Sequence, residues 1–103
     1  MRSRWIFAPS PEGWPEFALS EWELERAGWS DYHPHSETNV VLAGELYVSC
    51  DDGPVVVAAV GDTVTVPAGV VGRYWAPSFA RMLAIYGPNP DAQETELLGY
   101  WEL

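Results

Sequence analysis

The sequence predicts an all-β domain, folded as an antiparallel sandwich or closed barrel. Nine glycines and nine prolines divide its 103 residues into short apolar segments at near-regular spacing. Short segments rich in β-branched and aromatic residues, separated by turn residues, are typical of strands in such folds. No segment has the length and period of a convincing helix. A chain of this length is expected to form one domain. Folding would bury roughly 60–70% of its unfolded surface, which is enough for a single core.

Strands are expected where apolar residues alternate or run together between turn signals. The start of the first segment, 16–25, also fits a turn of helix, but Trp22 and Leu24 alternate with acids, which favours a strand. The run 55–60 is unbroken and apolar, as in a strand buried on both faces or lying at a dimer contact. The expected strands are 16–25, 29–33, 38–42, 45–49, 55–60, 63–66, 71–75 and 80–86.

The two ends of the chain are expected to be arms. Residues 1–15 hold Trp5, Ile6, Phe7 and Trp14 among prolines, and they are too apolar for a free tail, so they must cover something. Residues 91–98 are expected to form a short helical or irregular link to a last apolar piece, 99–103.

Charge excludes some classes of partner. Fifteen acids against five Lys and Arg give a formal charge of −10, which repels nucleic-acid phosphates and anionic lipid surfaces. No apolar run approaches the roughly 18 residues of a membrane span, and the start lacks a signal-peptide pattern, so we expect a cytoplasmic protein. Cys50 is the only cysteine, which excludes an internal disulfide and fits a reducing compartment.

Residues 28–44 hold the only two histidines, with acids on both sides. Asp31, His33 and His35 are spaced by two, so on an extended strand their side chains leave from one face. Glu37 follows, and Asn39 continues its parity on the next expected strand. Imidazoles and carboxylates bind divalent metals and transfer protons, so this stretch is the candidate site.

This stretch resembles the first motif of the cupin family, G(X)5HXH(X)3-4E(X)6G. Glu37 precedes Gly44 by the six-residue gap of the motif, and His33 stands at its second histidine. Asp31 occupies the place of the first histidine, and His35 is additional.

Residues 61–69, GDTVTVPAG, resemble the first part of the second cupin motif, G(X)5PXG(X)2H(X)3N. Gly72 stands where that motif has its histidine, and Ala76 replaces the asparagine. The resemblance covers about residues 21–88. It implies a small jelly-roll barrel, the double-stranded β-helix, within a single domain of residues 1–103 whose arms pack on the barrel or on a partner.

The resemblance also implies a metal site inside the barrel. The best ligand set is Asp31, His33 and Glu37, with His35 in reserve, and it suits Mn, Fe, Ni or Zn. The alternative is a wet polar pocket without a tightly held ion. The absent imidazole at Gly72 is expected to leave space of side-chain size, to be filled by water or a ligand.

The alternation of side chains along the expected strands adds Asn39 and Tyr74 to the pocket. Tyr74 shares the parity of Gly72, so its phenol is expected to enter the cavity, although core packing is an equal alternative. On 80–86, either Leu83 and Ile85 or Met82, Ala84 and Tyr86 face inward. The expected pocket residues are Asp31, His33, His35, Glu37, Asn39 and Tyr74.

Three functions fit these features. The first is a small-molecule-binding cupin, with or without a divalent metal. The second is a metal-dependent enzyme, an oxygenase, isomerase, lyase or hydrolase acting on a small polar metabolite. The third is a non-catalytic sensor or interaction module. A homodimer is also expected, because residues 1–14 or 55–60 would otherwise expose more apolar surface than monomers usually do.

Overall fold

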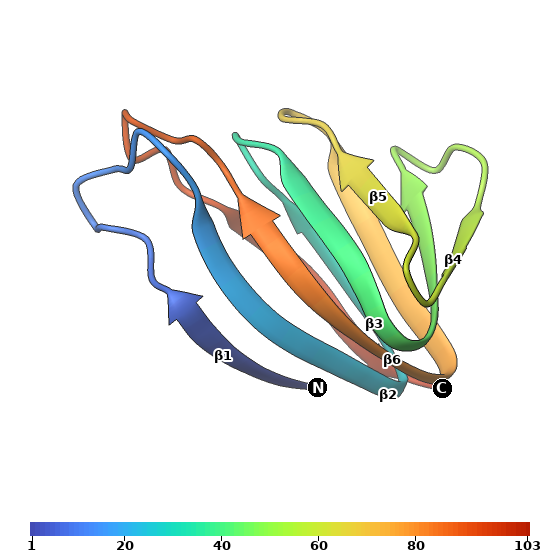
Figure 1. Cartoon of the computed structure of the whole chain (residues 1–103). Coiled ribbons are helices and arrows are strands. Elements are labelled where there is room, and N and C mark those ends of the chain that lie inside the picture. The colour runs from blue at the N-terminus through green and yellow to red at the C-terminus, as the bar shows by residue number, and fades with distance from the viewer.

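The computed structural model describes all 103 residues and contains strands but no helix. The absence of helices means that none is available to cross a membrane. The seven strands are β1 (Arg2–Phe7), β2 (Ala18–Tyr32), β3 (Glu37–Cys50), β4 (Val56–Ala59), β5 (Thr63–Val66), β6 (Val71–Tyr86) and β7 (Glu96–Glu102) (Figure 1). The prediction of an all-β, antiparallel jelly roll is confirmed.

The long strands β2, β3 and β6 form the centre of the fold, and each contributes to two layers (Figure 1). The first half of β2 pairs with the second half of β6, where Trp22 lies opposite Met82. The second half of β2 pairs with the first half of β6, where Asp31 lies opposite Gly72. β1 and β5 complete one layer, whereas β7 and β4 complete the other. This arrangement produces a curved sheet that folds over its own core.

The breaks expected between the strands 16–25 and 29–33, 38–42 and 45–49, and 71–75 and 80–86 were wrong, because the chain continues as strand through all three places. Bulges take the place of turns. The register of β2 shifts next to Arg26, which has a positive φ of 44°, and the register of β3 shifts around Gly44. A Cβ on Gly44 would lie 1.9 Å from the carbonyl oxygen of Phe79, so only glycine permits β6 to approach there.

The bulge at Arg26 decides which residues of β2 face the interior. Before it, the buried residues have even numbers and include Trp22 and Leu24. After it, Gly28 and Ser30 are buried as well, but Ala27 belongs to the hydrophobic cluster and Trp29 and Asp31 line the interior cavity, so the inward parity has become odd. The positive φ of Arg26 breaks the alternation of β2 and therefore places the carboxylate of Asp31 inside the fold.

Burial also shows which residues at the C-terminal end of β6 face the interior. Ala80, Met82 and Ala84 are completely buried, and Tyr86 packs against them, so this set faces inward. The hydrophobic cluster comprises Trp22, Leu24, Ala27, Val41, Leu46, Val48, Ala58, Val66, Tyr74, Ala76, Ala80, Met82 and Ala84.

The edge strands are much more exposed than the centre. All six residues of β1 are exposed, and in β4 only Ala58 is buried. The interpretation of 55–60 as a strand buried on both faces was wrong, because β4 ends the sheet and pairs only with β3. Residues 91–95 are irregular as expected, but a regular strand begins at Glu96.

Candidate metal centre and ligand cavity

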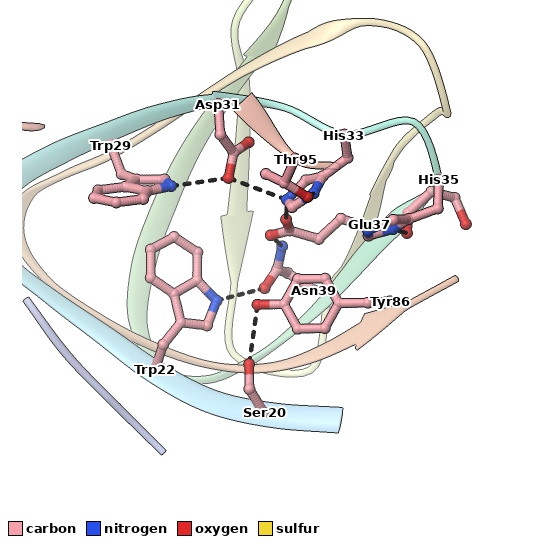
Figure 2. A network of polar contacts seen from close by, with 11 residues as sticks. Ser20, Trp22, Trp29, Asp31, His33, His35, Glu37, Asn39, Tyr86 and Thr95 are labelled. Atoms are coloured by element: carbon pink, nitrogen blue, oxygen red, sulfur yellow. Dashed lines mark hydrogen bonds and ion pairs between the residues drawn. The ribbon is translucent and has the colours of Figure 1, made fainter. Parts of the chain in front are cut away.

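A buried histidine lies between two buried carboxylates at the end of β2 and the start of β3. His33 Nε2 lies 2.8 Å from Glu37 Oε1 and 3.1 Å from Asp31 Oδ2 (Figure 2). One ligand atom from each of the three residues lies within 4.8 Å of the other two. The three residues, Asp31, His33 and Glu37, are hereafter called the triad.

Neighbouring side chains fix two members of the triad. Thr95 Oγ1 lies 2.7 Å from His33 Nδ1, and Trp29 Nε1 donates to Asp31 Oδ2 over 2.9 Å (Figure 2). Because Nδ1 of His33 is engaged by the threonine, Nε2 is the ring nitrogen directed at the acids. Outer contacts of this kind orient metal ligands in proteins.

The third member, Glu37, is fixed through a buried amide. Asn39 Nδ2 donates to Glu37 Oε2 over 2.8 Å, and Trp22 Nε1 donates to Asn39 Oδ1 over 2.8 Å. Asn39 is completely buried, so this chain of contacts has no competition from solvent. Glu37 Oε1 remains free to face His33.

The charges of the two acids change the protonation of His33. Burial alone lowers the pKa of His33, but the adjacent carboxylates of Asp31 and Glu37 outweigh burial and raise it to about 9. His33 is therefore an imidazolium at neutral pH in the metal-free protein. Its contacts with the acids have the distances of ion pairs but not the geometry of N–H···O hydrogen bonds, since Nε2 has no hydrogen-bond partner. We take the attraction to be mainly one of charge.

A cavity of about 310 Å³ opens beside the triad. Its walls come from both layers and include residues of the edge strands β1 and β7, so both arms of the chain contribute to it. The lining residues are Met1, Ser3, Trp5, Pro9, Trp14, Ala18, Trp22, Trp29, Asp31, His33, His35, Glu37, Tyr86, Thr95 and Leu97. Residues of the segment 1–15 thus form part of the cavity wall.

Three tryptophans of the cavity wall direct their N–H groups at protein acceptors. Trp14 Nε1 donates to the carbonyl of Tyr86 over 3.1 Å, and Trp22 and Trp29 donate to Asn39 and Asp31. With their only donors engaged, these indoles offer the cavity carbon surface. The result is an apolar chamber with one strongly polar end.

The Cupin domain family matches residues 20–86, more than half of the chain. The chain belongs to the cupin family. A search of curated proteins gives no match.

Solved structures share the fold of this cupin. One is a Salmonella typhimurium LT2 protein assigned as ethanolamine utilization protein Q, with 26% identity, a TM-score of 0.66, and coverage of 71% of this chain and 58% of that one. Another is a cupin-like protein from Thermotoga maritima, with 17% identity, a TM-score of 0.77 and coverage of 94% and 74%. The DMSP lyase DddQ from Ruegeria pomeroyi has 16% identity, a TM-score of 0.75 and coverage of 93% and 50%. The cupin described here spans only part of each.

His35 lines the cavity but does not join the triad. Its Nδ1 donates to the carbonyl of Ser36 over 3.0 Å, and its ring packs against Trp14, His33 and Tyr86. Burial and the charge of His33 lower the pKa of His35, although the contact with Ser36 opposes this. This cupin thus keeps a neutral imidazole beside a charged one.

Asn39 and Tyr74 lie behind the cavity wall, since both are completely buried and neither contributes to its lining. The space expected at Gly72 does not exist. A Cβ on Gly72 would lie 2.9 Å from both Cε2 and the hydroxyl oxygen of Tyr74, so the phenol fills that space.

Sequence reasoning missed Thr95 and most of the wall. Thr95 lies in a link without periodicity, so no pattern identified it. The tryptophans of the wall had a signal in their number, six in the chain, but not in their spacing.

The triad suits a divalent metal in this structure. One imidazole nitrogen and two carboxylates form a mixed N,O set that suits first-row metals, and three protein ligands leave positions for water or a ligand. His33 Nε2 and Asp31 Oδ1 are buried without hydrogen-bond partners, which is rare for groups that have no further role. A cation that replaces the proton of His33 would engage Nε2.

Proposed function

We propose that this cupin binds a small amphipathic molecule in the cavity beside the triad, and that Asp31, His33 and Glu37 hold a divalent metal at its polar end. One observation carries this proposal: three buried ligand atoms converge at the end of a chamber whose walls are mostly carbon. Apolar pockets with a few convergent polar groups are typical ligand sites.

The shape and chemistry of the cavity define the class of ligand. Its volume of about 310 Å³ is at the lower end of the range of ligand pockets, so the ligand is small. Its apolar part would pack on the indoles of Trp14, Trp22 and Trp29, and an oxygen donor would point at the triad. Mn, Fe, Ni and Zn are the candidate metals, because each accepts imidazole together with carboxylate.

A metal-dependent enzyme is the second candidate, and His35 is the observation that favours it. A bound metal would polarise an oxygen of the substrate. His35 lines the same cavity and is held neutral by burial, so its Nε2 would accept a proton while Nδ1 stays bonded to Ser36. The indole walls would exclude water from the reacting group.

Elemental analysis and native mass spectrometry of the purified protein test the proposal. We expect the purified protein to contain one kind of divalent metal, at up to one ion per chain. We also expect a bound small molecule that is released when the protein is denatured. His33→Gln and Glu37→Gln should lose the metal, whereas the matched variant His35→Gln should keep it. Parent protein that stays metal-free after dialysis against each of the four metals would contradict the metal site. A ligand retained by metal-free protein would support small-molecule binding and contradict the metal site.

We also infer that the chain acts in the cytoplasm as a homodimer. The single Cys50 fits a reducing compartment. Apolar side chains on both edges of the sheet are solvent-exposed, with Phe7 63% and Val60 64% exposed. A second copy of the chain is the partner that would cover them.

A further inference from the structure

Tyr74 has a buried hydroxyl group that the proposed function does not use. The residue is completely buried, and no protein atom forms a hydrogen bond with its hydroxyl oxygen. Its ring packs edge-on against Trp22, with centroids 5.6 Å apart and an interplanar angle of 83°. A phenol that only fills a core would be replaced without loss by phenylalanine, so the unpaired hydroxyl needs a reason.

The phenol occupies the space above Gly72. The hydroxyl oxygen and Cε2 each lie 2.9 Å from the point at which a side chain of residue 72 would begin. Any larger residue at position 72 would push the phenol away. Because Gly72 has no side chain, the ring of Tyr74 can occupy this space.

This position lies beside the triad. Gly72 is directly opposite Asp31 in the pairing of β2 with β6, and the Cβ positions of directly opposed residues are about 4.5–5.5 Å apart. Asp31 Oδ1 is also buried without a partner. A free donor on β6 and a free acceptor on β2 therefore face the same part of the interior.

The protonation of Tyr74 agrees with a donor role. Burial, followed by the charges of Glu37 and Asp31, raises the pKa of Tyr74 well above its usual value. The phenol keeps its proton at every physiological pH, so its hydroxyl is a donor and not a phenolate ligand.

We propose that Tyr74 is a positioning residue of the triad, whose hydroxyl donates through one buried water molecule to Asp31 Oδ1 and so directs Oδ2 at the metal. A buried water needs at least two polar partners, and these two atoms supply them. The positioning role rests on the proposed metal site, whereas the contact between Tyr74 and Asp31 does not.

The contact is tested first in metal-free protein, by a double-mutant cycle of Tyr74→Phe and Asp31→Leu followed by urea unfolding. Tyr74→Phe keeps the ring and removes only the donor. If the hydroxyl donates toward a carboxylate, this variant should lower the folding equilibrium constant about tenfold, and the effect should vanish in the Asp31→Leu background. Tyr47→Phe is the matched control, because Tyr47 packs on Trp75 and makes no side-chain hydrogen bond.

The positioning role is tested with Co(II), whose visible spectrum reports the geometry of its ligands. We expect Tyr74→Phe to weaken Co(II) binding about 10-fold to 100-fold and to change the spectrum, while Tyr47→Phe changes neither. Gly72→Ala, which displaces the phenol, should reproduce the altered spectrum.

The outcomes separate this inference from the proposed function. An unchanged or raised stability of Tyr74→Phe, with no coupling to Asp31, would overturn the contact. An unchanged Co(II) spectrum and affinity would overturn the positioning role while the metal site stands. Parent protein that binds no Co(II) or other divalent metal would overturn the proposed metal site and the positioning role together, and the cycle would still decide the contact.

Discussion

Thr95 Oγ1 and His33 Nδ1 are 2.7 Å apart, although 62 positions separate the two residues in the chain. This contact joins the segment before β7 to the triad. It also determines which ring nitrogen of His33 faces Asp31 and Glu37, because only Nε2 is left for them. The C-terminal arm therefore belongs to the candidate site as well as to the sheet.

Removing the hydroxyl of Thr95 should weaken metal binding more than it weakens the fold. We expect Thr95→Val to lower metal affinity about tenfold or more, since His33 loses the partner that orients it, and to cost about 1 kcal/mol of unfolding free energy. Isothermal titration with Zn or Mn measures the affinity. Thr38→Val is the matched control, because it removes an exposed hydroxyl contact with Thr65. Equal affinity in the Thr95 variant and the parent would contradict an orienting role.

The stability of the metal-free protein should depend on the protonation of His33. Its pKa is raised from 6.5 to about 9 in the folded state, so the protonated form stabilises the fold. The contribution, about 3 kcal/mol, should be complete below pH 6.5 and disappear as pH rises through about 9. Urea unfolding with a chelator present should show this loss in the parent but not in His33→Gln. Parallel pH profiles of the two proteins would contradict it.

Metal binding should remove the proton from His33. A cation at Nε2 competes with the proton, so below about pH 9, where the folded metal-free protein carries this proton, metal uptake should release it. Titration in buffers of different ionisation enthalpy measures that release.

Introducing a histidine at Gly72 should give a result opposite to the one that the sequence indicates. The motif suggests that Gly72→His completes the metal site, but its Cβ would lie 2.9 Å from the phenol of Tyr74. We expect the single variant to lose about 1–3 kcal/mol of stability through overpacking. Gly72→His combined with Tyr74→Ala should recover stability and bind Zn more tightly than the single variant does. A fully stable single variant would show that Tyr74 moves aside.

The proposed homodimer should depend on one of the two exposed apolar edge strands, β1 or β4. Light scattering at high micromolar concentration should give twice the chain mass, and a monomer there would contradict the prediction. Ile6→Lys on β1 and Val57→Lys on β4 place a charge on each exposed edge in turn. The variant that dissociates identifies the interface, and the other serves as its control.

Much of the fold could be predicted from the sequence for a physical reason: residues of a strand alternate between its two faces, and turn residues mark most strand ends. Asp31 lies near the end of β2, His33 in the link and Glu37 at the start of β3, so their proximity was expected from the resemblance to the cupin motif and not from alternation along one strand. The irregularity at Arg26 has no such signature, because Arg26, Ala27 and Gly28 have the composition of a turn although the strand continues through them.

The cavity wall could not be predicted from the sequence, because it depends on long-range pairing. The positions of Trp5 and Leu97 follow from the pairing of both β1 and β7 with β2, and periodicity within either segment says nothing about that partner. Similarly, the contact of the Tyr74 ring with Gly72 depends on the side-chain rotamer of Tyr74. Parity places both residues on one face and leaves their mutual contact undetermined.

Four of the six tryptophans line the cavity, and Trp75 and Trp101 lie outside it. Indole emission shifts to shorter wavelength when water leaves its surroundings and is quenched by bound paramagnetic metals. The intrinsic fluorescence of the protein should therefore report occupancy of the cavity. Compound libraries and metal series can be screened in this way against the unlabelled chain.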